Sequence, residues 1–167
     1  MGEFSDTPYT ERTDAQKAKT QWGKALGLLN RSDWSAAIVR AVTSTEISLN
    51  LAIRREHEER GQLSANEVDQ LLHNANGISG KLSILEDLAH NARKEKIRGL
   101  KEGTRSAAIK RNRIVHSGEF CDEEEARAHI ESCRVFVNSL IRDYDPLFEP
   151  LSQIARDEIR PDEDPGA

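Results

Sequence analysis

Apolar residues recur every three to four positions along most of the chain, which is the spacing of one buried helix face. The clearest runs each follow a capping signal, since Asp33 precedes the apolar positions of 34–60 and Asp122 precedes those of 123–144. No segment alternates with a period of two, and no Asn-Gly turn joins two β-branched runs. The pattern therefore predicts an all-α protein.

Caps and breaks set the expected helix bounds. Helices are expected over 14–29, 34–60, 64–75, 79–98, 104–116 and 122–144. We expect a loop from Gly99 to Gly103 and a helix cap at Thr104, and we expect Ser117-Gly118 to end the next helix near His116. Because short loops favour antiparallel neighbours, the expected architecture is an antiparallel helical bundle of about five helices.

One domain, residues 14–158, accounts for most of the 167 residues and is long enough to bury a core without disulfides or a structural metal. Residues 1–13 are polar and are expected to form a flexible leader, and residues 159–167 an acidic, disordered tail. Charges interrupt the apolar stretches, and the N-terminus has no apolar signal region. These features predict a cytoplasmic protein with no membrane span.

The overall charge and the local charge differ in sign. The formal net charge of −5 argues against a general nucleic-acid coat, which is normally basic. Residues 93–113, however, contain nine cations and only two anions, which is a local excess of seven positive charges. Such a segment is usually a solvated helix face, but it is also able to guide a polyanion.

The end of this basic segment carries groups suited to phosphoryl chemistry, Arg111, Asn112 and His116. Arginine matches phosphate oxygens with a planar set of donors, and histidine transfers a proton near neutral pH. Asn112 and His116 are one helical turn apart, whereas Arg111 and His116 differ in direction by about 140°. We expect two features to bring them together: a helix end that frees His116, and a second copy of the chain across a two-fold axis.

The arrangement Arg111-Asn112-x-x-x-His116 resembles the R-x4-H signature of the HEPN superfamily, in which a polar residue often follows the arginine. Residues from about 33 to 143 also resemble the HEPN plan, in which a long early helix packs against the motif-bearing helix. The resemblance implies metal-independent cleavage of RNA by a homodimer, with the substrate's 2′-hydroxyl attacking the adjacent phosphate. It also implies a toxin or defence effector with a separately encoded antitoxin partner.

The resemblance assigns a role to each candidate residue. His116 is the general acid or base, Arg111 holds the phosphate, and Asn112 orients His116 or contacts the ribose. An acidic residue on a facing helix often completes such sites, and Glu46 is the candidate because it is the one charge among residues 41–53. The expected substrate contacts are the neighbouring cations Lys110, Arg113 and Arg105.

Simpler interpretations stay open for each of these residues. Arg111 could pair with Glu119 or Glu123, His116 could serve only as a favourable charge at a helix C-terminus, and Glu46 could be structural. The rival function is a catalytically inactive HEPN-like binding or regulatory module. The helical segment 78–88 also resembles the mannitol operon repressor family, which has a related helical plan.

No pattern indicates a metal or a cofactor. His129 and Cys133 lie one turn apart, but a zinc site needs three or four ligands and no further pair has suitable spacing. The sequence has no phosphate-cradling glycine-rich loop, no G-x-S-x-G and no H-E-x-x-H. We therefore expect chemistry carried by side chains alone.

Overall fold

The computed structural model describes residues 6–155, which form six α-helices and one 3-10 turn and contain no strand. The elements are η1 (Tyr9–Glu11), α1 (Asp14–Leu29), α2 (Trp34–Arg60), α3 (Ala65–Asn74), α4 (Gly77–Leu88), α5 (Asn91–Ser117) and α6 (Glu123–Tyr144). The all-α prediction is confirmed, with six helices in place of about five.

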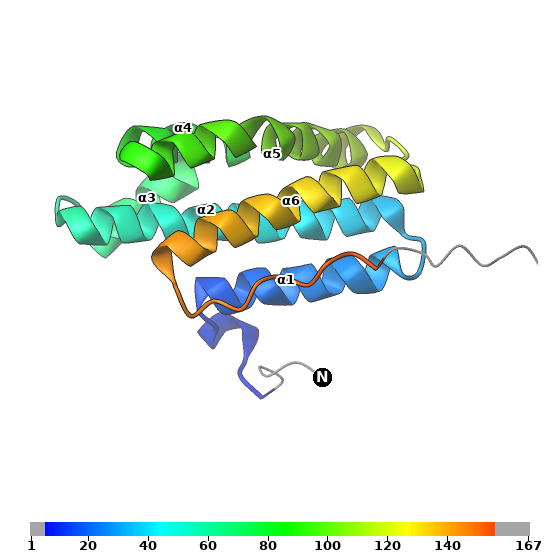
Figure 1. Ribbon diagram of the computed structural model, residues 1–167, viewed down its shortest axis with the longest axis horizontal. Helices are drawn as coiled ribbons and strands as arrows, with labels where there is room; N and C mark the ends of the chain where they lie inside the picture. Colours follow the sequence, from blue (N-terminus) through cyan, green and yellow to red (C-terminus); the bar gives the residue numbers. More distant parts are fainter. Residues whose placement is uncertain (1–5, 156–167) are drawn as a thin grey trace, which may run out of the picture.

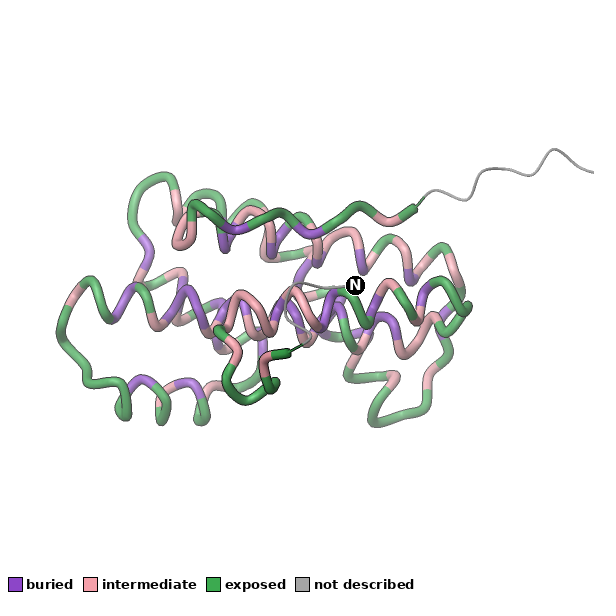
Figure 2. Tube along the Cα trace, turned by 90° about the horizontal axis from the view of Figure 1, so that it is seen from below, coloured by how far each residue is buried: buried purple, intermediate pink, exposed green. Residues whose placement is uncertain are grey.

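Helix α2 lies at the centre of the molecule and contacts each of the other five helices (Figure 1). Helices α4 and α5 cover one side of the α2–α6 pair, and α1 covers the other side. The buried positions follow the inner sides of the helices (Figure 2). The largest fully buried side chains include Phe136, Ile38, Leu49, Ile53, Leu82, Leu85, Ile130 and Ile141.

The central position of α2 explains its composition. By length and composition α2 is apolar enough to cross a membrane, contrary to the expectation that no segment would be. However, 61% of its most apolar window is buried inside the bundle. A helix surrounded by other helices is apolar on nearly all sides, so α2 is a core helix.

Most helix ends follow the capping residues expected from the sequence. The side chains of Asp33, Ser64 and Asp122 each accept a hydrogen bond from a backbone N–H of the first turn. At the other end, α2 and α5 stop at Gly61 and Gly118, whose φ angles are 63° and 64°. Glycine adopts this left-handed conformation at little cost, so both helices end there.

The expected boundary between the fourth and fifth helices is wrong. Helix α4 ends at Leu88, and α5 runs from Asn91 without interruption through the residues 99–103 that were expected to form a loop. Thr104 caps nothing, because its hydroxyl donates to the carbonyl of Leu100 inside the helix at 3.2 Å. At Gly103 an added Cβ would lie 3.2 Å from the Ser132 side chain, so this glycine permits the close approach of α5 and α6.

Segments outside the helices are attached to the bundle by specific hydrogen bonds. Before α1, the Arg12 guanidinium donates to the Thr20 hydroxyl at 2.9 Å. After α6, residues 145–155 run back along the bundle, where the Leu151 N–H donates to Asn138 Oδ1 at 2.7 Å and the Trp22 indole N–H donates to the Ser152 carbonyl at 3.2 Å. Residues 1–5 of the expected leader and the expected tail, 159–167, lie outside the described residues.

Candidate functional site

The last two turns of α5 present His116 and Asn112 to solvent. Both are exposed, as are Arg113 and Ile109, which lie on the same helix face at three- and four-residue spacing. Within residues 6–155, the side chains of His116, Asn112 and Arg113 make no hydrogen bond or ion pair, and Asn112 does not contact His116 in that way. The imidazole is therefore available to a ligand or to a second protein chain.

Arg111 points the other way, toward α2. Its Nη2 lies 3.6 Å from Glu46 Oε2, and its side chain is 26% exposed. At this distance the two groups form an ion pair but no hydrogen bond, so the donors of the Arg111 guanidinium stay available. The structure thus brings Arg111 to Glu46, the acidic residue expected on the facing helix, and not to Glu119 or Glu123.

Glu46 has a second cationic partner that sequence reasoning missed. Lys81 Nζ on α4 donates to Glu46 Oε1 at 2.6 Å, and the Lys81 side chain is only 8% exposed. The two residues are 35 positions apart, so only the packing of α4 against α2 brings them together. A lysine on the buried face of a helix, beside Ile78 and Leu82, was the available signal.

Within one chain, Arg111 and His116 do not converge on one pocket. Helix α5 stays regular through Ser117, so the expected release of the His116 backbone does not occur. The two side chains keep the divergence of about 140° that five residues of helix impose. Two features were expected to bring these side chains together, a helix end that frees His116 and a second copy of the chain. This geometry is compatible only with the second.

Lys110, expected to contact substrate, is buried and fully occupied. Its Nζ contacts Glu119 Oε1 at 2.5 Å, Glu125 Oε2 at 2.8 Å and the Phe120 carbonyl at 3.0 Å. The hydrogen bonds that Lys110 donates to Glu119 and Glu125 raise the pKa of Lys110 to about 12. An ammonium group has three protons, so we assign Lys110 to fixing the turn between α5 and α6.

Cys121 lies in the same turn. Burial, followed by the hydrogen bond to Glu125, raises the pKa of the Cys121 thiol to about 12. The thiol is therefore protonated at neutral pH and is a poor nucleophile.

The remaining cations of the basic segment are mostly paired. Arg105 Nη1 lies 3.2 Å from Glu102 Oε1. Of the nine cations between residues 93 and 113, all inside the described chain, seven form ion pairs and two, Lys94 and Arg113, form none with residues 6–155. The local excess of positive charge is thus largely neutralised by carboxylates from other helices.

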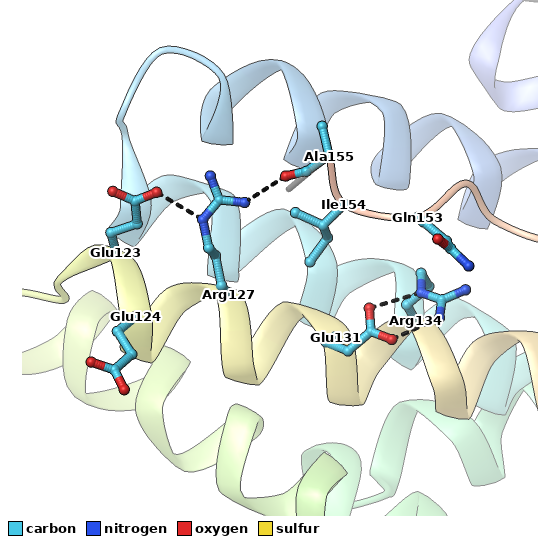
Figure 3. Close-up of a pocket in the computed structure, with 8 residues that line it drawn as sticks. All are labelled: Glu123, Glu124, Arg127, Glu131, Arg134, Gln153, Ile154 and Ala155. Atoms are coloured by element: carbon cyan, nitrogen blue, oxygen red, sulfur yellow. Dashed lines mark hydrogen bonds and ion pairs between the residues drawn. The ribbon is translucent and has the colours of Figure 1, made fainter. Parts of the chain in front are cut away.

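One hollow on the described part of the chain lies along α6, apart from the motif. It has a volume of about 770 Å³ and lies between α6 and residues 153–155 (Figure 3). Arg127 and Arg134 point along it, each paired with a glutamate of α6 at 2.7 Å, Glu123 and Glu131 respectively. None of the motif residues lines it.

The histidines, cysteines and carboxylates of residues 6–155 form no group of three or more placed to hold a metal ion. Comparisons with protein families, with curated proteins and with solved structures gave no match to this chain.

Proposed function

We propose that this chain is a metal-independent endoribonuclease of HEPN type that acts as a homodimer in the cytoplasm, as a toxin or defence effector controlled by an antitoxin protein. The observation that carries the proposal lies in the last two turns of α5. There the exposed imidazole of His116 makes no hydrogen bond or ion pair with residues 6–155. The guanidinium of Arg111, five residues earlier, makes no hydrogen bond, so its donors are available. These are the groups that cleavage of an RNA phosphodiester requires.

The proposed reaction forms a bond between the ribose 2′-oxygen and phosphorus and breaks the bond from phosphorus to the 5′-oxygen. His116 carries one of the two proton transfers, either taking the proton of the 2′-hydroxyl or giving one to the departing 5′-oxygen, and water carries the other. Arg111 donates to the non-bridging phosphate oxygens, where negative charge develops. Asn112, exposed one turn before His116, contacts the ribose. The products are a 2′,3′-cyclic phosphate and a free 5′-hydroxyl.

A dimer is part of the proposal because one chain does not join the two groups. The apolar residues Ile109, Val115 and Phe120 are 52%, 53% and 92% exposed on and just after the same end of α5. Exposed apolar side chains beside polar groups are typical of a surface that a partner covers. We propose that a second copy covers them and that each site combines His116 of one copy with Arg111 of the other.

The decisive experiment is RNA cleavage in the presence of EDTA. We expect the protein to cut single-stranded RNA and leave cyclic phosphate ends, and we expect His116→Ala and Arg111→Ala each to abolish cutting with the fold intact. The matched control is His73→Ala, which removes another exposed histidine from the last turn of a helix. Full activity in His116→Ala would contradict the catalytic assignment.

Mixing the two inactive variants tests the composite site. A mixed dimer of His116→Ala and Arg111→Ala contains one site in which both groups are intact, so a random mixture regains about a quarter of the activity. If both groups act within one chain, the mixture stays inactive.

One observation favours the second candidate function, an inactive HEPN-like binding or regulatory module. Seven of the nine cations in the basic segment are already paired within residues 6–155, which leaves little positive charge to attract RNA. Absence of cleavage at every protein concentration, together with harmless expression in cells, would make this function the better one.

A further inference from the structure

Lys81 is a buried cation that the proposed reaction does not use. It lies on the inner face of α4, between the buried residues Ile78 and Leu82, and its side chain is 8% exposed. Glu46 is the one charged partner it has among the described residues, at 2.6 Å. Burial of a charge is unfavourable unless a partner compensates it, so the Lys81–Glu46 pair is fixed more firmly than a surface ion pair.

The carboxylate of Glu46 is shared unequally between two cations. Its Oε1 hydrogen-bonds Lys81, whereas its Oε2 lies 3.6 Å from Arg111 Nη2. An arginine and a carboxylate left to themselves prefer a two-pronged contact with distances of about 2.7–2.9 Å. The observed distance is longer, and the three side chains together carry one net positive charge.

We infer that Lys81 is a positioning residue, which holds the Glu46 carboxylate away from the donors of Arg111 so that Arg111 is oriented but free to bind a phosphate group. Without the ammonium group, Glu46 closes on Arg111, occupies its donors and cancels its charge. The inference rests on the proposed function in one respect, since it takes the phosphate to be that of RNA.

The first test measures binding of a fluorescent 2′-O-methyl oligoribonucleotide, which lacks the attacking hydroxyl, by anisotropy. In Lys81→Met we expect affinity to fall about tenfold, the size of one lost charge-assisted contact. The double variant Lys81→Met/Glu46→Gln regains binding, because the neutral amide no longer cancels Arg111. In an Arg111→Gln background, Lys81→Met has no further effect, because it acts through Arg111.

The matched control is Lys101→Met, which breaks the 3.0 Å pair with Glu86 between α4 and α5 and leaves Arg111 untouched. It should bind the oligonucleotide as the unmodified protein does. A Lys81→Met variant that binds like the unmodified protein would overturn the inference. So would a loss that Glu46→Gln fails to reverse, because Lys81 would then be only structural.

A second readout does not depend on RNA. The ¹⁵N-edited side-chain NMR signal of Arg111, assigned by its disappearance in Arg111→Gln, reports how fast its guanidinium protons exchange with water. We expect slower exchange in Lys81→Met and ordinary exchange in Lys81→Met/Glu46→Gln. Unchanged exchange in Lys81→Met overturns the inference, whereas failure of the unmodified protein to bind RNA overturns the proposed function alone.

Discussion

Glu56 shows how a single buried charge organises one end of the bundle. It is 4% exposed, and its Oε1 accepts hydrogen bonds from the Tyr144 hydroxyl at 2.7 Å and from Arg93 Nη1 at 3.2 Å. The Arg93 guanidinium also lies 4.6 Å from the centroid of the Tyr144 ring. Burial, with Glu56 beside it, raises the pKa of Tyr144, so the hydroxyl stays protonated and donates. The cluster joins the last turns of α2 and α6 to the first turn of α5.

Removing one hydroxyl tests the strength of this cluster. Tyr144→Phe keeps the ring over Arg93 but deprives a buried carboxylate of a donor, so we expect the free energy of unfolding to fall by about 2 kcal/mol in urea denaturation. The control is Tyr9→Phe, which removes an exposed hydroxyl that accepts a hydrogen bond from the buried Gln21 amide; because both groups are uncharged, it should cost only about 1 kcal/mol. Equal losses in the two variants would contradict the role of Glu56.

Part of the candidate site was predictable residue by residue. Glu46 stood out as the one charge in an otherwise uncharged run, and it does contact Arg111. Lys81 and the engagement of Lys110 were not predicted. The position of Lys81 on the buried face of α4 marked it as unusual, but its partner Glu46 is 35 residues away, and the partners of Lys110 depend on how the chain turns between α5 and α6. The divergence of Arg111 and His116 follows from their spacing, and the straight course of α5 to Ser117 preserves it.

At the scale of the helix, capping residues predicted most helix ends correctly. Glycines led to one wrong prediction, the boundary between α4 and α5. The break between α4 and α5 falls at Ala89 and His90, followed by Asn91 with φ of 50°, where no glycine or proline marks it. The sequence predicts a loop at Gly99 and Gly103, but both lie inside α5. Tertiary packing overrides helix propensity there, since at Gly103 the second helix passes close by.

These two glycines make a matched pair. An added Cβ meets nothing within 4 Å at Gly99, so Gly99→Ala should raise the free energy of unfolding by about 0.5–1 kcal/mol. At Gly103 the same methyl group meets Ser132 at 3.2 Å, so Gly103→Ala should give no such gain. Both are measured by chemical denaturation, and an equal gain at the two positions would show that α6 does not constrain α5.

Ion pairs between α4 and α5 carry a pH dependence. Hydrogen bonds from Arg98 and then Lys101 lower the pKa of Glu86 from 4.5 to about 2. A carboxylate with a lowered pKa in the folded state contributes stability above pH 4.5, and this contribution is lost as the pH falls toward 2. In Glu86→Gln, the melting temperature should therefore fall less between pH 4.5 and pH 2 than in the unmodified protein. An equal fall in the two proteins would show that other groups cause the pH dependence.

At the scale of the whole molecule, most cations of the basic segment 93–113 are paired with carboxylates and are not available to a polyanion. Its cations form ion pairs with Glu46 and Glu56 on α2, Glu86 on α4 and Asp143 on α6. The local excess of charge is visible in the sequence, but the carboxylates that other helices bring to it are not. We conclude that few positive charges are left for a polyanion.

This conclusion predicts a weak salt dependence of RNA binding. If Arg111 and Arg113 of each copy contact phosphates in a dimer, the slope of log K against log salt concentration is about −3 for single-stranded RNA. Engagement of all nine cations of even one chain would give about −6 or steeper. Titrations between low and physiological salt distinguish the two values, and the steeper slope would show that the ion pairs open on binding.

The path of residues 145–155 decides where a label can safely be attached. These residues end beside the start of α6, where Arg127 donates to the Ala155 carbonyl at 2.9 Å, and Lys110 ties this end of α6 to the end of α5. The described chain begins instead beside α1, in the layer opposite α5 (Figure 1). A label that must not disturb the motif is therefore better attached at an exposed residue of α1, such as Lys24, than at residues 153–155.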